Sequence, residues 1–232
     1  MTRAKDLGLH EEIMLLSLRE QEGTMEFGTS WSLAVGGAIV AQLMIDGHLA
    51  AAVDGKRTFL EVDDATPPTD ELLAECLERV RISRRRETVQ TWVTRFANTK
   101  QLKHRVAVAL CRRKILKADE GKVLLFFRRR VYPEVDPKPE KELRERMRRA
   151  IFLNGTSVDP RTGVVIALSH GCGILPRIFE KKKLKERKAR LDKIMKGDLV
   201  GDAAKQAVEA VQAAVLMSVI IPTVITSAAT SR

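Results

Sequence analysis

Aromatic residues are scarce in this sequence of 232 residues. They make up 4% of it, with two Trp and one Tyr. A core with so few rings must be built mainly from Leu, Val, Ile and Ala, and we expect it to be largely helical. The scarcity also argues against a protein that binds single-stranded nucleic acid, because such proteins stack bases on interleaved aromatic side chains. Of the candidates Phe126, Phe127 and Tyr132, the first two are explained more simply by a strand.

Cysteine is rare as well, and no cysteine or histidine has a partner in the sequence that would make a reactive site. Three widely spaced cysteines are typical of free thiols in a reducing compartment, so we expect a cytoplasmic protein. We expect no metal, no cofactor and no enzymatic activity, because no pair has zinc-ligand spacing and no nucleophile, base and orienting group come together. The residues concerned are Cys76, Cys111, Cys172, His10, His48, His104 and His170.

Long apolar runs are missing too. The longest, Ala213–Ile225, is interrupted by Pro222 and is shorter than the roughly 20 residues that span a bilayer. The first residues show no apolar region of the kind found in secretion signals. Any membrane association predicted from this sequence is therefore peripheral.

What the sequence has in excess is positive charge. Lys and Arg total 41 against 30 Asp and Glu, which gives a net charge of +11. Such a charge attracts polyanions over a distance, and nucleic acid, acidic proteins and anionic lipid headgroups all qualify. A solvated surface that only keeps the protein in solution is an equally simple reading. The basic residues gather in three stretches, at 84–86, 128–130 and 141–149.

The third basic stretch has the spacing of a binding face. Lys141, Arg144 and Arg148 share one side of a helix, because residues three and four apart are neighbours on its surface. Several donors on one face can hold a phosphate, and Arg can do so with two hydrogen bonds. The alternative is a solvated face on which the basic residues pair with Glu140, Glu142 and Glu145. Both readings stay open.

Hydrophobic periodicity predicts a mostly α-helical, single-domain bundle with small β-hairpins. The domain spans 1–232, with a core at about 7–215 and an apolar tail at 216–232. We expect Trp92 to be buried. Helices are predicted at 7–18, 32–46, 71–82, 87–97, 101–114, 141–152, 181–196 and 202–221. Hairpins are predicted at 48–62, with the turn at Asp54-Gly55, at 115–129, with the turn at 119–122, and, as a hairpin or tight turn, at 154–163.

Several strings, in order and at matching spacing, resemble one family. They run from the opening helix to the strand that precedes Pro133, and the similarity covers roughly Leu7 to Val215. The sequence resembles the Golgi phosphoprotein 3 family, which includes the yeast Vps74 proteins. The strings are LHEEIMLLSLRE at 9–20, GHL at 47–49, TPPT at 66–69, ETVQTW at 87–92 and VLLFF at 123–127.

The resemblance implies a helical domain and a non-enzymatic peripheral membrane protein. Eukaryotic members recognise phosphatidylinositol 4-phosphate on the cytosolic face of the Golgi and act as adaptors that bind cytoplasmic tails of membrane proteins. We therefore expect anionic lipid headgroups as partners, with such tails as a second class, and no nucleic acid. A scaffold that binds client tails without lipid recognition remains the alternative, and a homo-oligomer is left open.

The resemblance also implies a lipid site. Its aromatic residue falls at or beside Phe27, with Trp31 nearby, and its basic helix residues fall on Lys141 and Arg144, with Arg148 one turn further on. The arginine expected in the second helix falls on Gly36. Because glycine supplies no charge there, we expect weaker and less selective headgroup binding than in eukaryotic members.

Overall fold

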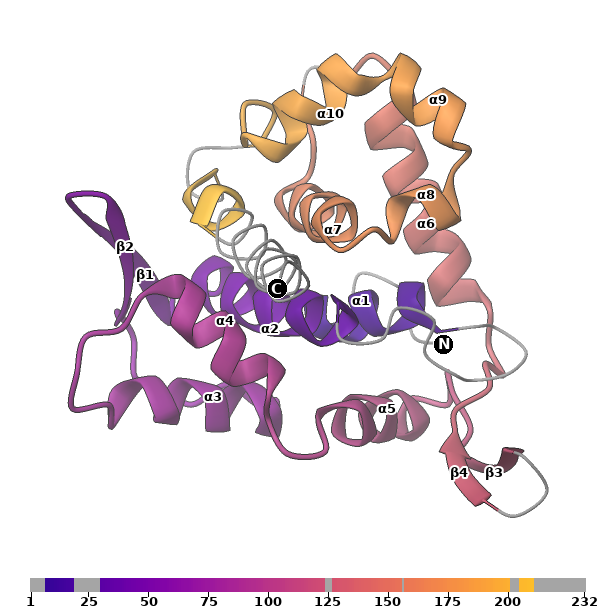
Figure 1. The fold of residues 1–232 in the computed structure, drawn as a ribbon, viewed down its shortest axis with the longest axis horizontal. Helices are drawn as coiled ribbons and strands as arrows, with labels where there is room; N and C mark the ends of the chain where they lie inside the picture. Colours follow the sequence, from indigo (N-terminus) through magenta and orange to yellow (C-terminus); the bar gives the residue numbers. More distant parts are fainter. Residues whose placement is uncertain (1–6, 19–29, 124–126, 156, 201–204, 211–232) are drawn as a thin grey trace, which may run out of the picture.

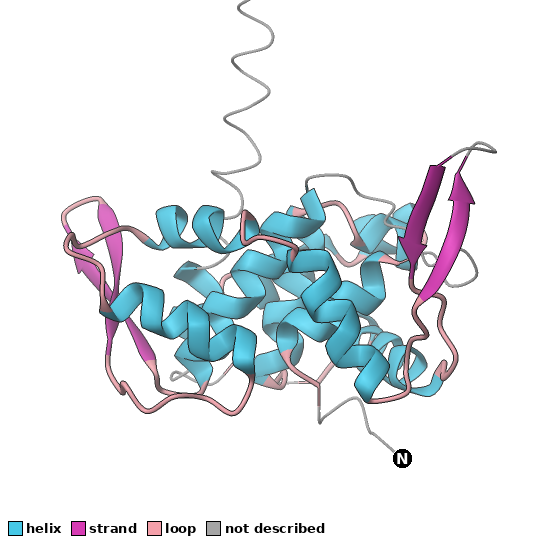
Figure 2. Ribbon diagram, turned by 90° about the horizontal axis from the view of Figure 1, so that it is seen from below, coloured by secondary structure: helices cyan, strands magenta, loops and turns pink. Residues whose placement is uncertain are grey.

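The computed structural model describes residues 7–18, 30–123, 127–155, 157–200 and 205–210. Most of these residues are helical, and two short hairpins lie at opposite ends of the molecule (Figure 1 and Figure 2). The expected fold class, a mostly α-helical bundle with small β-hairpins, is confirmed. In chain order the elements are α1 (Leu9–Ser17), α2 (Ser30–Ile45), β1 (Leu49–Asp54), β2 (Arg57–Val62), α3 (Glu71–Arg81), α4 (Val89–Ala97), α5 (Leu102–Arg112), β3 (Asp119–Val123), β4 (Phe127–Val131), α6 (Lys138–Phe152), α7 (Pro160–Gly171), α8 (Leu175–Ile178), α9 (Lys181–Glu186) and α10 (Lys188–Met195).

Helix α2 is the centre of the core. All residues from 34 to 43 are buried, as expected for a helix that is apolar on every side. Helix α1 packs along it in the opposite direction, so that the Leu9 N–H donates to the Gln42 side chain at 3.0 Å. Helices α4 and α7 pack against other sides of α2. The predicted burial of Trp92 in α4 is confirmed, at 2% exposed.

Polar side chains fix the starts of three helices. Asp70 accepts hydrogen bonds from the Leu72 and Leu73 N–H groups at the start of α3. Thr88 and Asp159 cap α4 and α7 in the same way. Each cap satisfies backbone donors that have no partner within the helix.

The first hairpin is where the sequence predicted it, and the second is not. Strands β1 and β2 pair from Leu49–Val62 to Asp54–Arg57, so the turn is Gly55-Lys56, one residue later than the predicted Asp54-Gly55. The predicted turn at 119–122 is wrong, because these residues belong to strand β3. Their polar composition suggested a turn, but a two-stranded ribbon needs no apolar face, so polar residues can lie within it.

The C-terminal half differs from the prediction in three places. Helix α6 begins at Lys138, before the predicted start, because Pro139 fits the first turn of a helix. The hairpin or turn predicted at 154–163 is wrong, since α7 begins at Pro160 within that range. The helix predicted at 181–196 is divided into α9 and α10 at Arg187. Residues 205–210 are helical, and the rest of the helix predicted at 202–221 lies outside the described residues.

Helices α8, α9 and α10 form an arch around α7, on the side of the molecule opposite α3 and α5 (Figure 1). Leu175, Leu184, Leu191 and Ile194 face inward from this arch and belong to the same hydrophobic core as α1 and α2. The lysines of α9 and α10 are exposed. The arch thus joins a buried apolar face to a strongly basic exterior.

Candidate functional site

The candidate site begins on α6, whose two faces have different roles. Leu143, Met147 and Ile151 are fully buried and hold the helix on the core. The remaining surface is charged, with six basic and three acidic residues between Lys138 and Phe152. The helix therefore offers cations to solvent from a rigid support.

Lys141 is the predicted site residue that is most available for a ligand. Its side chain is exposed, and no described carboxylate forms an ion pair with it. It lies in the first turns of α6, close to where the helix leaves the Pro137 loop. A flexible ammonium group in this position can meet a phosphate without giving up another contact.

Arg144 points partly back towards the protein. Its Nε donates to Glu140 Oε1 at 2.7 Å, and Glu140 is only 4% exposed. The arginine is itself half-buried. Its charge is therefore shared with a buried carboxylate, and it would contribute less to an external anion than Lys141 does.

Arg148 is held by a neighbouring carboxylate. It donates to Glu145 through two nitrogens, at 2.6 and 2.9 Å, and Arg149 donates to the same carboxylate at 2.9 Å. The hydrogen bonds from Arg148 and then Arg149 lower the pKa of Glu145 to about 2. The structure therefore agrees with the alternative given above for Arg148, in which its charge is paired with a glutamate of the same helix.

The aromatic part of the predicted site is described only in part. Trp31 is the second residue of α2; it is half-buried and packs against the hydrophobic core. Phe27 lies outside the described residues. Trp31 thus has one side in the core and another accessible, an arrangement that suits an interfacial aromatic residue.

Gly36, the position at which the resemblance led us to expect an arginine, has a structural role. It lies where α2 packs on α4, and a Cβ built on it would be 2.4 Å from the Val93 carbonyl oxygen and 2.9 Å from the Ala97 nitrogen. Both neighbours are backbone atoms, which cannot move aside as a flexible side chain can. In this chain the position serves close helix packing, and no side chain could present a charge from it.

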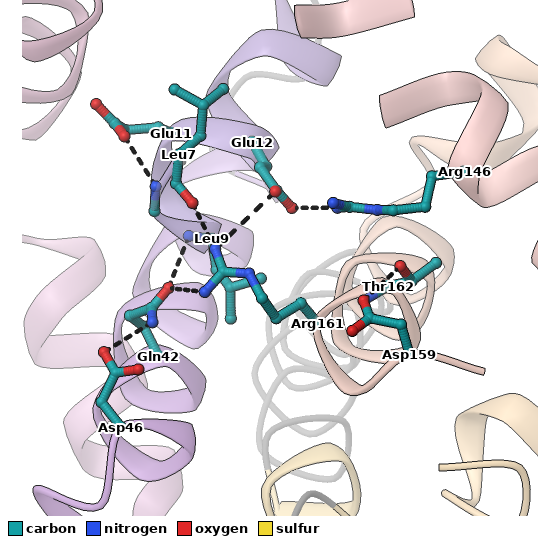
Figure 3. Close-up of polar contacts among 11 residues, drawn as sticks. Leu7, Leu9, Glu11, Glu12, Gln42, Asp46, Arg146, Asp159, Arg161 and Thr162 are labelled. Atoms are coloured by element: carbon teal, nitrogen blue, oxygen red, sulfur yellow. Dashed lines mark hydrogen bonds and ion pairs between the residues drawn. The ribbon is translucent and has the colours of Figure 1, made fainter. Parts of the chain in front are cut away.

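A buried polar network, which the sequence did not reveal, fixes α6 and α7 to α1 (Figure 3). Glu12 is fully buried and accepts from Arg146 of α6 at 2.8 Å, with Arg161 of α7 at 3.9 Å. Arg161 also donates to the Leu7 carbonyl oxygen and to Gln42. Burial raises the pKa of Glu12, although both arginines act to lower it.

The network removes one candidate from the basic face. Arg146 belongs to the 141–149 stretch, yet its guanidinium points inward to Glu12. In the sequence, its position next to Met147 and three residues after Leu143 was the available signal, because it places Arg146 at the edge of the buried face. The arginine positions the helix that carries Lys141 and does not present its own charge to solvent.

Two of the histidines, His10 and His104, have polar side-chain partners, which corrects the expectation that each histidine is isolated. His10 Nε2 lies 3.4 Å from Asp70 Oδ2, beside a cavity of about 410 Å³. His104 Nδ1 and the Tyr132 hydroxyl form a hydrogen bond of 2.6 Å. Burial alone would raise the pKa of Asp70, but His10 and the Leu73 and Leu72 N–H groups lower it to about 2.

Helix α3 also carries a buried thiol, Cys76. Burial raises the pKa of Cys76 to about 12, so it stays protonated at neutral pH. Within the described ranges, no group of three or more His, Cys, Asp or Glu is arranged to hold a metal ion. Nor does any described helix have the length and apolar character needed to cross a membrane.

Comparison with known proteins matches nearly the whole chain to one protein family. The sequence model of the family described as Golgi phosphoprotein 3 (GPP34) matches residues 9–211. The vacuolar protein sorting-associated protein 74 of Eremothecium gossypii is 25% identical over 209 residues. That alignment covers 77% of this chain and 63% of the relative, so the chain spans less than two thirds of the relative's length. The family match includes every described element from α1 to the helical residues 205–210.

Proposed function

Because the chain belongs to the Golgi phosphoprotein 3 (GPP34) family, we propose that it is a peripheral membrane protein that binds anionic phospholipid and acts as an adaptor. The observation that carries the proposal is Lys141 near the start of α6, which is exposed and forms no ion pair with a carboxylate of the described residues, beside the more internally held Arg144. The proposal includes phosphatidylinositol 4-phosphate among the ligands, and it places the protein on the cytoplasmic side of a membrane, at the Golgi if the host is eukaryotic.

Charge supports this proposal at two levels. The chain has a net charge of +11, which would draw it to an anionic surface before any specific contact forms. At the surface itself, each basic residue contributes about 1 kcal/mol, and the effect fades within a Debye length. Lys141 supplies such a charge directly, whereas Glu140 already shares the charge of Arg144.

Trp31 would supply the apolar part of the contact. An amphipathic ring at the level of the headgroups buries apolar area and fixes the depth of the protein in the interface. Trp31 is half-buried on the first turn of α2 and is held there by the core. The proposed site combines this residue with Phe27, Lys141 and Arg144, and Arg148 extends it where its pairing with Glu145 permits.

Weak headgroup selectivity is part of the proposal. The family's second-helix arginine has no equivalent at Gly36, where the packing of α4 leaves no space for a side chain. With one fewer fixed donor, binding would depend more on the total charge of the surface than on the identity of the headgroup. We further propose that the protein performs this function without catalysing a reaction.

A protein scaffold that binds client tails without lipid recognition is the second candidate. The pairing of Arg144 with Glu140 and of Arg148 with Glu145 favours it, because these arginines already have anionic partners. The two candidates differ in one respect that can be measured. Only the first requires Lys141 and Arg144 for binding to vesicles that carry no protein.

Co-sedimentation with vesicles tests the proposal. We expect wild type to bind vesicles containing phosphatidylserine or phosphatidylinositol 4-phosphate at low salt and to bind less at physiological salt. A Lys141→Ala/Arg144→Ala variant should lose about tenfold in affinity, which corresponds to ~1.4 kcal/mol. This is less than two full charges, because Arg144 is partly neutralised.

A matched variant controls for net charge. Arg81→Ala/Lys100→Ala removes the same two charge types on the side of the molecule that carries α3, and Arg81 is likewise paired, with Glu78 at 2.6 Å. It should retain binding within about twofold. Equal losses in both variants would show that only total charge matters, and unchanged binding in the α6 variant would favour the scaffold.

A further inference from the structure

A second surface, away from the proposed lipid site, has the features of a peptide groove. Helices α8, α9 and α10 enclose a hollow of about 320 Å³ with the end of α7. Its apolar floor is formed by Leu184, Leu191 and the exposed Pro176, and Leu175 borders it with no exposed surface. Lys181, Lys185 and Lys188 line its rim. We refer to this feature as the arch groove.

The rim lysines are not engaged elsewhere. All three side chains are exposed, and no carboxylate in the described ranges forms an ion pair with any of them. Lys183 on the same helix, by contrast, pairs with Glu180 at 2.8 Å. Asp192 also lines the hollow, so the rim keeps an excess of positive charge. This excess lies around an apolar floor rather than on a flat face.

The burial of the arch leucines indicates that the arch binds a ligand in its groove and does not insert its own side chains into a membrane. A helix that inserts into a membrane keeps its apolar side chains free to enter the lipid. Here Leu184 and Leu191 are 9% and 4% exposed because they pack against the core. A flat layer of headgroups would leave the concave floor unfilled, whereas an apolar side chain from a peptide can occupy it.

We infer that the arch groove binds an acidic amphipathic segment of a partner protein, with an apolar side chain against Leu184, Leu191 and Pro176 and carboxylates against Lys181, Lys185 and Lys188. The volume lies at the lower end of the range for ligand pockets. Complementary charge around an apolar anchor gives both orientation and a fast, salt-dependent association. This inference does not depend on lipid binding at α6.

The test uses a defined probe, a fluorescein-labelled synthetic peptide with Leu at i, i+3, i+4 and i+7 and Glu at most other positions. Fluorescence anisotropy measures its binding to the full chain. We expect saturable binding to wild type that weakens as salt increases. The same peptide with Lys in place of Glu should not bind.

Two triple variants locate the contact. Lys181→Glu/Lys185→Glu/Lys188→Glu reverses the rim and should weaken binding at least tenfold. Lys182→Glu/Lys193→Glu/Lys196→Glu makes the same change in charge on exposed lysines of the same arch that do not line the hollow, and it should bind within about twofold of wild type. His170→Trp adds bulk at the edge of the groove and should also weaken binding.

Several results would overturn the inference. Absence of saturable binding, or equal losses in both triple variants, would show that no such site exists. Binding of phosphatidylcholine–phosphatidylserine vesicles that depends on the rim lysines, without peptide binding, would assign the groove to a membrane. A wild-type dimer in light scattering that the rim variant abolishes would assign it to a second copy of the chain.

Discussion

Replacing Gly36 by alanine tests whether the packing of α2 on α4 excludes a side chain at this position. The added Cβ would lie 2.4 Å from the Val93 carbonyl oxygen and 2.9 Å from the Ala97 nitrogen. Ordinary contact begins at 3.4 Å, so α2 and α4 would have to separate locally by about 1 Å. The two helices form one of the most extensive contacts in the core, so this movement would disturb many neighbours.

The expected loss of stability follows from two opposing effects. Forcing extra atoms into a packed core costs about 1–3 kcal/mol. Alanine in place of glycine within a helix regains about 1 kcal/mol of intrinsic propensity. Because the obstructing atoms belong to the α4 backbone, we place the packing cost at the upper end of its range and expect a net loss of about 2 kcal/mol. In a chain of this size that lowers Tm by roughly 4–8 °C.

Thermal and urea unfolding measure this loss, and Gly163→Ala is the matched control. Gly163 is also a buried helical glycine, but the nearest atoms to its added Cβ belong to the Val200 side chain, at 3.3 Å. That side chain can shift, so this variant should stay within about 1 kcal/mol of wild type. A Gly36→Ala variant as stable as Gly163→Ala would refute the reasoning.

Two further predictions concern buried charge. Arg146→Met should destabilise the protein by about 3–5 kcal/mol in urea unfolding at neutral pH, because it leaves Glu12 buried without its closest cation. Arg148→Met on the same helix should cost under about 0.5 kcal/mol. Equal losses of stability in the two variants would contradict the buried polar network. The pKa of Asp70 is lowered in the fold to about 2, so its contribution of roughly 2 kcal/mol is present above pH 4 and lost as pH falls towards 2. The difference in unfolding free energy between wild type and Asp70→Asn should therefore shrink over that range, and a constant difference would be inconsistent with a lowered pKa of Asp70 in the fold.

Local signals in the sequence predicted much of the fold. The turn residues near Asp54-Gly55 between two apolar runs located the first hairpin, and the helix predicted at 71–82 matches α3, which begins after its Asp70 cap. The helix predicted at 87–97 included Thr88, which the structure shows to be the cap residue before α4. The second hairpin was displaced because polar residues at 119–122 can occupy either a turn or an exposed ribbon. A pattern of residue types cannot distinguish these when no face of the ribbon has to be buried.

The site was harder to predict because it depends on which way each charge points. Lys141, Arg144, Arg146 and Arg148 are all basic and close together in sequence, yet their surroundings differ. Lys141 is exposed, Arg144 and Arg148 pair with glutamates of α6, and Arg146 reaches Glu12 across the core. The partner of Arg146 is 134 positions away in the chain, a distance over which helical periodicity carries no information.

Trp31 fluorescence tests the proposed membrane contact most directly. The sequence contains two tryptophans, so Trp92→Phe leaves Trp31 as the only reporter. On anionic vesicles we predict that its emission shifts to shorter wavelength and is quenched by brominated lipid, and that both changes need about tenfold more lipid in the Lys141→Ala/Arg144→Ala variant and weaken as salt increases. Emission that stays the same while the protein sediments with the vesicles would contradict the account, since binding would then occur away from the start of α2.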